Sequence, residues 1–371
     1  MITNLILSHY RNHTHLQITP EAPYILISGP NGSGKTNVLE ALSFLSPGRG
    51  LRGAKLQDII PNGSTEHWTV HAQLAIHGET RSIGTALESS EGAGKRVVKI
   101  DQIFQKSQLA LAEHLRMLWL TPQMEPALLS GTTARRHYID RITFYFDPEH
   151  AKRVAHYEKT LRERSKLLSL PPYDADWCRV LEERLASLSL RITQTRKEAL
   201  ERVMQHIDAL SPSFPRALLR MVGGVETLLA SHSKEEAEAL LTKQLSESRQ
   251  KDYYTGQTSH GAHRSDLEVY HAQPEQSFAL CSTGEQKALL LSLLLAQARA
   301  SLQHYSTPPI LLLDEVAVHL DDARRNALFQ ELLALQVQCW VTTTDPDLFH
   351  TVEQHCHHIV LDHTNKALLT I

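Results

Sequence analysis

The order of apolar and polar positions predicts an α/β chain. The short apolar run Tyr24–Ser28, bounded by Pro23 and Gly29, predicts a buried strand, and a helix over residues 37–45 should follow it. Residues 66–104 consist of short alternating runs separated by glycine-rich turns, a pattern typical of antiparallel strands. We therefore expect a mixed sheet accompanied by an antiparallel subdomain.

A block of helical periodicity interrupts this α/β pattern. Between residues 147 and 210 the apolar positions, such as Leu181, Leu185 and Leu188, recur at intervals of three and four. The block predicts the core of a helical lobe, with a short coiled-coil arm as the alternative.

The α/β pattern then returns, with a strand near residues 310–313, a helix near 322–335 and a strand near 339–343. The helical lobe is therefore predicted to be inserted between two halves of one α/β lobe. We place the first half at residues 1–128, the helical lobe at 129–250 and the second half at 251–371.

The clearest motif fits G-x-x-x-x-G-K-[ST] in full and lies between a predicted strand and a predicted helix. It consists of Gly29, Pro30, Asn31, Gly32, Ser33, Gly34, Lys35 and Thr36. Glycines let backbone N–H groups turn around phosphate oxygens, and the start of a helix favours an anion. Lys35 is predicted to reach the β- and γ-phosphates and Thr36 to bind Mg²⁺, so we expect ATP and Mg²⁺ as cofactors.

An acidic pair ends a second apolar run, PPILLLDE over residues 308–315. Its four consecutive apolar residues predict a strand that is buried on both faces. Two carboxylates at the end of such a strand are costly to bury without a cation. Asp314 is predicted to hold Mg²⁺ and Glu315 to orient or deprotonate the attacking water, which makes them catalytic residues together with Lys35. A pair that merely caps a helix is the alternative.

A third motif, CSTGEQK over residues 281–287, opens a long apolar stretch. Ser282 and Glu285 form a capping-box pattern, and a helix N-terminus is also an anion site. In this context Ser282, Gly284 and Gln286 resemble the signature motif of ABC-type ATPases. In those proteins the motif contacts the γ-phosphate of a nucleotide held by the opposite subunit.

Together these motifs resemble the SMC/Rad50-like branch of ABC ATPases and, within it, the RecF family. The resemblance covers essentially the whole chain, through the segments HYRNH, LISGPNGSGKTNVLEAL, TPQMEPALLSGTTARRHYIDR, SHGAHRSDLEV and LLLDEVAVHLD. It implies a P-loop ABC-type ATPase lobe with an inserted α-helical lobe. It also implies an ATP-driven head-to-tail homodimer that clamps duplex DNA near single-strand gaps and hydrolyses ATP slowly, stimulated by DNA. The implied partners are RecO- and RecR-type proteins and RecA, in DNA replication, recombination, repair and the SOS response.

The resemblance also assigns individual residues. Arg11 and Asn12 are expected near the nucleotide, Gln123 is the counterpart of an Mg²⁺-contacting glutamine, and Asp321 belongs to the loop that meets the opposing subunit. Four residues are candidates for either fold or DNA contacts: Arg135, Arg136, His263 and Arg264.

The chain departs from the family pattern at three places. Ala262 stands where proline is usual, Val318 replaces a small residue, and residues 342–344 are threonines where many ABC ATPases have a switch histidine. We therefore assign no γ-phosphate-sensing histidine, which fits slow hydrolysis.

Charge weighs mildly against DNA binding, since 38 Lys+Arg and 41 Asp+Glu give the 371-residue chain a formal net charge of -3. The charge is uneven, however, because residues 133–220 contain 17 Lys+Arg and 12 Asp+Glu. The motifs outweigh the global value, and the helical lobe is predicted to carry the positive surplus.

No signal-peptide pattern or long apolar span is recognisable, and the four cysteines form no CxxC pair. These features predict a cytoplasmic protein. The run His355-Cys356-His357-His358 suggests a metal site, but it falls where a strand is expected and alternate side chains would diverge. Two further functions stay open: the ATPase cassette of a transporter, and a non-hydrolysing protein that uses ATP only to hold a dimer together.

Overall fold

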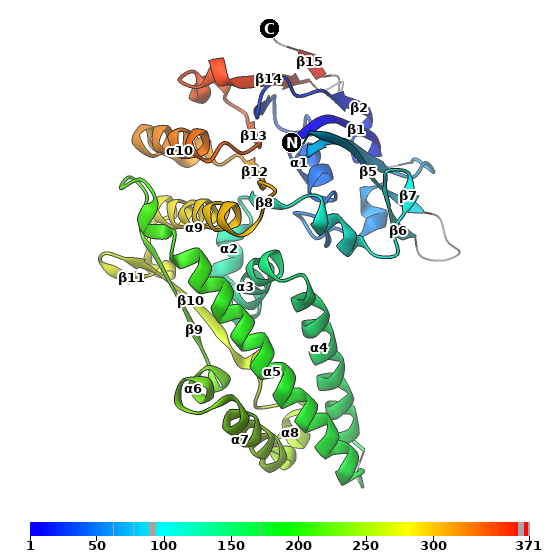
Figure 1. The fold of residues 1–371 in the computed structure, drawn as a ribbon, viewed down its shortest axis with the longest axis vertical. Coiled ribbons are helices and arrows are strands. Elements are labelled where there is room, and N and C mark those ends of the chain that lie inside the picture. Colours follow the sequence, from blue (N-terminus) through cyan, green and yellow to red (C-terminus); the bar gives the residue numbers. More distant parts are fainter. Residues whose placement is uncertain (62, 77, 89–93, 171, 363–366, 370–371) are drawn as a thin grey trace. The chain divides into compact units, whose positions relative to one another are not determined.

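The computed structural model describes the chain except for residues 62, 77, 89–93, 171, 363–366 and 370–371. The chain forms two compact units (Figure 1). The first unit comprises Met1–Met124, Ala209–Pro215 and Ser282–Ile371, and the second comprises Glu125–Asp208 and Arg216–Cys281. In sequence, the second unit is therefore inserted into the first.

The second unit ends later than residue 250, the boundary expected from the sequence. Strand β10 (Asp266–Ala272) pairs antiparallel with β9 (Ala217–Val222), and the Arg196 guanidinium donates a hydrogen bond to the Ala262 carbonyl at 3.0 Å. Through these contacts, residues 251–281 pack with the helical unit and belong to it. The strand pattern that resumes there belongs to the small sheet of that unit.

The first unit contains an antiparallel sheet with the order β2-β1-β4-β5-β6-β7. Its strands are β1 (Ile2–Tyr10), β2 (His13–Ile18), β4 (Thr69–Ile76), β5 (Glu79–Glu88), β6 (Lys95–Ile100) and β7 (Ile103–Phe104). The strands β4 to β7 follow one another closely in sequence, as do β1 and β2, which suits the antiparallel connections predicted from the alternating runs.

A second sheet has the order β15-β14-β3-β13-β12-β8. Its strands are β3 (Tyr24–Ser28), β8 (Met117–Leu120), β12 (Ile310–Asp314), β13 (Cys339–Thr343), β14 (Cys356–Leu361) and β15 (Ala367–Leu369). Every neighbouring pair is parallel except β14 and β15. The mixed sheet and the antiparallel subdomain expected from the sequence are both present.

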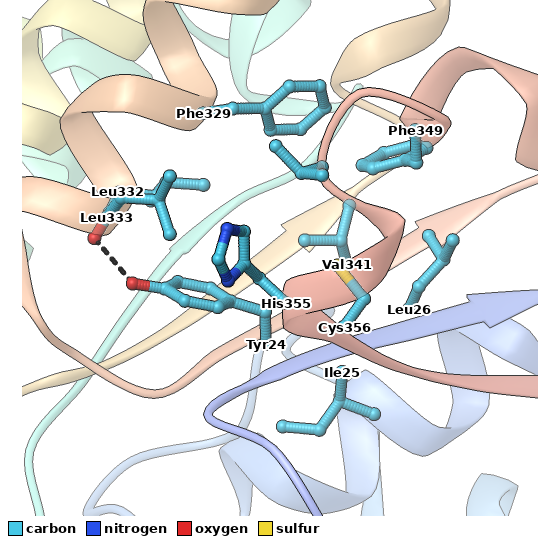
Figure 2. Close-up of a pocket in the computed structure, with 11 residues that line it drawn as sticks. Tyr24, Ile25, Leu26, Phe329, Leu332, Leu333, Val341, Phe349, His355 and Cys356 are labelled. Atoms are coloured by element: carbon cyan, nitrogen blue, oxygen red, sulfur yellow. Dashed lines mark hydrogen bonds between the residues drawn. The ribbon is translucent and has the colours of Figure 1, made fainter.

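Strand β3 is buried on both faces because its alternate side chains enter different layers. Ile25 and Ile27 join the core that the two sheets share with helix α1 (Lys35–Ser43). On the opposite face, Tyr24 and Leu26 line a small apolar pocket beneath helix α10 (Asp322–Leu335). In Figure 2, the Tyr24 hydroxyl donates a hydrogen bond to the Leu332 carbonyl at 3.0 Å, and Ile25 points away from the pocket.

Helix α9 completes the first unit and spans Thr283–His304. Its middle is almost continuously apolar, and the residues Ala288–Ala300 are buried apart from Arg299. It packs against β8 and α10. Short 3-10 turns in this unit are η1 (Leu56–Ile59), η2 (Gln108–Glu113), η6 (Ala317–His319), η7 (Pro346–Phe349) and η8 (Glu353–His355).

The second unit is mostly helical. Helices α4 and α5 run side by side, and the apolar stripe of α5 packs against α7 (Figure 1). Its helices are α2 (Met124–Leu129), α3 (Thr132–Phe146), α4 (Glu149–Leu168), α5 (Ala175–Met204), α6 (Gly224–Ser231), α7 (Lys234–Glu247) and α8 (Arg249–Thr255). A three-stranded sheet of β9, β10 and β11 (Glu275–Ser277) and the turns η3 (Ile207–Ala209), η4 (Ala262–Arg264) and η5 (Phe278–Leu280) accompany them.

Candidate nucleotide-binding site

The phosphate-loop motif joins the carboxyl end of β3 to the start of α1, as the sequence predicted. Gly34 precedes the helix with φ 96°, a left-handed conformation that favours glycine. A Cβ atom at this position would lie 2.5 Å from Nε2 of His13 and 2.6 Å from Nδ2 of Asn12. Both the backbone conformation and the lack of space therefore require glycine.

Two polar side chains of the loop are suited to phosphate. The Ser33 hydroxyl is buried and has no hydrogen-bond partner among the described residues. The Lys35 ammonium donates hydrogen bonds to the carbonyls of Gly29 at 2.8 Å and Pro30 at 3.1 Å. Burial lowers the pKa of Lys35, and the nearby Glu315 and Asp314 oppose this shift. A buried hydroxyl donor without an acceptor fits a phosphate oxygen.

The acidic strand meets the phosphate loop through Asp314. The Thr36 hydroxyl donates a hydrogen bond to Oδ1 of Asp314 at 2.8 Å, although 278 positions separate the two residues. The Thr342 hydroxyl, on the intervening strand β13, donates to the same oxygen at 2.8 Å. A hydroxyl and a carboxylate held together supply the oxygen ligands that Mg²⁺ prefers.

Glu315 follows Asp314 in a left-handed backbone conformation, with φ 52°. Its N–H donates to the carbonyl of Thr342 at 3.2 Å and to the hydroxyl of Thr342 at 3.1 Å. A non-glycine residue in this conformation is strained by about 1–3 kcal/mol, and such strain is common at functional sites. Thr342 therefore fixes both members of the acidic pair, a role that no sequence motif indicates.

Arg11 contacts a buried carboxylate of α1. Its Nε and one terminal nitrogen each donate to Glu40 at 2.8 Å, and the other terminal nitrogen donates to the Asp58 carbonyl at 2.7 Å. The hydrogen bond to Glu40 raises the pKa of Arg11. In this structure the Arg11 side chain supports the helix that follows the loop. The predicted contact between Arg11 and nucleotide therefore stays a prediction.

Asn12 and His13 lie directly against the phosphate loop. Asn37 donates a hydrogen bond to Oδ1 of Asn12 at 2.6 Å, and Nε2 of His13 is 3.2 Å from the Gly34 carbonyl oxygen. His13 is fully buried, and burial lowers the pKa of its imidazole. The family resemblance indicates Asn12 but not His13 or Glu40, and no spacing links the latter two residues to the motif.

Gln123 is exposed three positions after the end of β8. Leu120, the last residue of that strand, pairs with Leu313 of β12. Because parallel strands end at the same edge of a sheet, Gln123 follows the same edge as Asp314. Its predicted contact with Mg²⁺ stays a prediction.

The signature-like motif begins α9. Ser282 is the N-cap, its hydroxyl accepts a hydrogen bond from the Glu285 N–H at 3.4 Å, and the Glu285 carboxylate accepts from the Ser282 N–H at 2.8 Å. Gly284 has open space where a Cβ would lie, and Gln286 is buried. Asp321 caps α10 through the Arg324 N–H at 2.8 Å. The capping function is present at both positions, and contact with a second subunit stays a prediction.

The four candidate residues of the second unit differ in their partners. Arg135 forms a two-bond ion pair with Asp266, at 2.8 and 2.7 Å. His263 accepts a hydrogen bond from Tyr157 at 2.6 Å, and burial lowers its pKa to about 4. Arg136 and Arg264 donate instead to backbone carbonyls. Arg135 and His263 therefore have clear structural roles.

The histidine-rich segment lies on β14 and the turn before it. His357 accepts a hydrogen bond from the Glu21 N–H at 3.0 Å, and His358 is 2.7 Å from the Ser28 hydroxyl. Over the part of the chain that the structure describes, no group of three or more His, Cys, Asp or Glu side chains is arranged to hold a metal ion. Within the same residues, no helix is long and apolar enough to cross a membrane.

Comparison with known proteins identifies the family. Residues 1–366 match the model of the RecF/RecN/SMC N-terminal domain. The DNA replication and repair protein RecF of Rickettsia bellii is 40% identical over 345 residues, which cover 92% of this chain and 94% of the relative. The chain belongs to the RecF family. The RecF proteins of Rickettsia canadensis and Rickettsia conorii are each 39% identical over the same shares of both chains.

Solved structures agree with this RecF assignment at the level of the fold. A structure described as the recombination mediator protein RecF-ATPrS in the RecFOR pathway matches with a TM-score of 0.84, 21% identity and coverage of 100% of this chain and 98% of the other. An SMC head bound to the C-winged helix domain of ScpA matches with a TM-score of 0.51, 14% identity and 97% coverage of that chain. The predicted ABC-type ATPase fold with an inserted helical lobe is thereby confirmed.

Proposed function

We propose that this RecF-family chain is an ATP-dependent DNA-binding protein of recombinational repair. The hydrogen bond from Thr36 to Asp314 is the observation that supports an ATPase site most directly, because it joins the phosphate loop to the acidic strand. The match to a structure described as RecF-ATP in the RecFOR pathway, with a TM-score of 0.83 and 22% identity, agrees with this site.

Within the site, Asn31–Thr36 supply the phosphate cradle, with the Ser33 hydroxyl and the Lys35 ammonium as donors. Thr36, Asp314 and Gln123 hold Mg²⁺, which neutralises charge on the phosphates when bound. Glu315 orients the attacking water and accepts its proton. Arg11 positions α1 through Glu40, and Asn12 supports the loop at Gly34.

Each site is completed by a second copy of the chain. Ser282, Gly284 and Gln286 at the start of α9 face the nucleotide of the opposing subunit, and Asp321 lies at the same junction. The exposed Ser282 cap and the open space beside Gly284 leave this helix N-terminus accessible to an anion. Two ATP molecules then join the subunits head to tail, and slow ATP hydrolysis releases the subunits from each other.

The dimer clamps duplex DNA near single-strand gaps, where RecO- and RecR-type partners assist the loading of RecA. The curated relatives are named as DNA replication and repair proteins, which supports this assignment. Because phosphate contacts release counterions, binding should weaken steeply as salt rises. ATPase activity measured without DNA, with duplex DNA and with gapped DNA tests the assignment. If the ATPase activity is the same with and without DNA and the chain copurifies with a membrane subunit, the transporter cassette is favoured instead.

The dimer is tested by measuring the mass of the protein with and without ATP. Wild type should dimerise only with ATP, whereas Lys35→Ala and Ser282→Arg should stay monomeric. Ser233→Arg is a matched control, because Ser233 is also the N-cap of a helix with a capping box, at the start of α7. If all variants form the same oligomer without nucleotide, the proposed dimer is wrong.

A further inference from the structure

A cavity of about 520 Å³ lies within the second unit, between the start of α3, the α4 helix and residues 256–264. The guanidinium groups of Arg136 and Arg264 line it, together with Thr132, Thr133 and Ser165. These side chains come from segments that are distant in sequence but belong to one compact unit. The cavity therefore combines two fixed positive charges with several hydroxyl groups.

The partly buried Arg136 and the exposed Arg264 differ in their partners from the buried arginines of this unit. Arg164 and Arg196 each form an ion pair with a carboxylate, as does the partly buried Arg249. Arg136 donates only to the Ser265 carbonyl at 3.1 Å and to the Thr133 hydroxyl at 2.9 Å among the described residues.

Arg264 likewise has neutral acceptors in the described chain. It donates to the Thr258 carbonyl at 2.9 and 2.7 Å and to the Gln257 side chain at 3.3 Å. Burial, Arg196 and Arg264 together lower the pKa of Arg136, and the more distant carboxylates of Asp266 and Asp140 oppose this shift. Among the described residues, neither guanidinium forms an ion pair with a carboxylate, so two positive charges line the cavity without a carboxylate at contact distance.

Such a cavity suits a phosphate group. A guanidinium offers paired N–H donors that match two phosphate oxygens, and hydroxyl groups are common additional donors to a DNA backbone. The cavity's described lining includes no Phe, Tyr or Trp on which a base could stack. The first turn of α3 adds to the positive potential, since Gly131 provides no side-chain cap.

We propose that this cavity binds a backbone phosphate of duplex DNA, with Arg136 and Arg264 as the phosphate ligands. The inference rests on the proposed DNA-binding function and adds a defined contact site to it. It also accounts for two of the four residues that the sequence left open between a fold role and a DNA role.

The test is duplex-DNA binding with ATP over a salt series. Each neutralised phosphate contributes about 0.9 to the slope of log affinity against log salt. Arg136→Gln and Arg264→Gln should each weaken DNA binding. The double variant should have a salt slope that is smaller in magnitude by about 0.9, whereas Arg136→Lys should keep the wild-type slope. Arg179→Gln, at an exposed arginine of α5, is the control for a general loss of charge.

Three outcomes are distinguishable. If the slope of log affinity against log salt is the same in wild type, in the Arg136 and Arg264 variants and in the control, the cavity assignment is wrong, although the protein still binds DNA. A wild type that binds no DNA at low salt, with or without ATP, overturns the proposed function and this site together. If inorganic phosphate shifts the arginine side-chain NMR signals of wild type but DNA binding is unaltered in the double variant, the cavity binds free phosphate rather than DNA. Thermal unfolding of each variant verifies that the second unit is folded.

Discussion

The Thr36 hydroxyl donates a 2.8 Å hydrogen bond to Asp314, and the Thr342 hydroxyl donates to the same carboxylate oxygen. Strand β13, which carries Thr342, lies between β3 and β12. The strand that leads into the phosphate loop, β3, and the acidic strand, β12, are therefore separated by a single strand. A threonine on that strand, Thr342, bonds to the acidic pair at the end of β12. This arrangement makes Thr342 part of the site even though no motif includes it.

Replacing Thr342 should consequently weaken ATP turnover. Thr342→Val keeps the shape of the side chain but removes the donor to Asp314 and the acceptor for the Glu315 N–H. A hydrogen bond to a charged group contributes about 1.5–3 kcal/mol, so kcat/KM for ATP should fall roughly 10- to 100-fold. Thr342→Ser, which retains the hydroxyl, should lose much less. Equal steady-state rates for the valine variant and wild type would remove Thr342 from the site.

Glu315→Gln separates ATP binding from hydrolysis. The amide is nearly isosteric but cannot accept a proton, so kcat should fall by about 10²–10⁴-fold while ATP still binds. Single-turnover hydrolysis and equilibrium nucleotide binding measure the two effects. The ATP-bound dimer should also persist longer than in wild type. Unchanged turnover would instead favour a protein that uses ATP only as a structural link.

Gly34→Ala should disrupt the phosphate loop. The added methyl would lie 2.5 Å from His13 Nε2 in a backbone conformation that alanine rarely adopts. We expect a loss of more than about 1 kcal/mol of stability and a severe loss of ATP affinity. Gly63→Ala is the control, because Gly63 also has positive φ, at 77°, but no atom within 4 Å of the added Cβ. Similar ATP affinities for the two variants would show that the close contact with His13 is unimportant.

The helical unit contains a buried ionic network around Glu182. Arg164 and Arg249 both donate to this carboxylate, at 3.1 Å and at 2.9 and 2.6 Å. Glu182→Gln removes the carboxylate that Arg249 pairs with and leaves Arg164 with Asp252 alone, so it should lower the free energy of unfolding by about 3 kcal/mol. Glu183→Gln, at the exposed neighbouring position on α5, should change it by less than about 0.5 kcal/mol. Chemical denaturation of the two variants measures the difference.

His263 predicts how the stability of the second unit depends on pH. Burial lowers the pKa of its imidazole from the ordinary value of 6.5 to about 4. The unfolded chain therefore binds a proton more readily than the folded chain over this range, so stability falls as pH decreases from 6.5 towards 4. His263→Gln should flatten this part of the profile, measured as the urea midpoint against pH. An unchanged profile would assign the acid sensitivity to other groups.

The elements that the sequence predicted well are those with a strong local signal. Tyr24–Ser28, Asp322–Leu335 and Cys339–Thr343 form the predicted elements because apolar runs or helical spacing end at distinct polar or turn residues. The phosphate-loop motif and Asp314 are also recognisable in the sequence because their chemistry depends on contiguous residues, and their contacts with ATP and Mg²⁺ stay predictions.

Contacts that depend on tertiary neighbours could not be predicted in this way. The pairing of Arg11 with Glu40, and of Arg135 with Asp266, joins residues with no recognisable spacing. Thr342 was noted only for not being histidine, because the order of strands in the sheet determines its role. The boundary at residue 250 differs from the structural one because strand periodicity cannot show which sheet a strand joins.

Strand β3 pairs only with β13 and β14 in the described sheet, so both of its neighbours come from residues 339–361. The strand that leads into the phosphate loop is therefore synthesised well before either of its partners. We expect the nucleotide site to remain unformed on nascent chains until β13 and β14 have left the ribosome. Ribosome-bound chains that end before residue 339 should therefore fail to retain ATP, which would restrict ATP-driven assembly to chains in which both strands are paired.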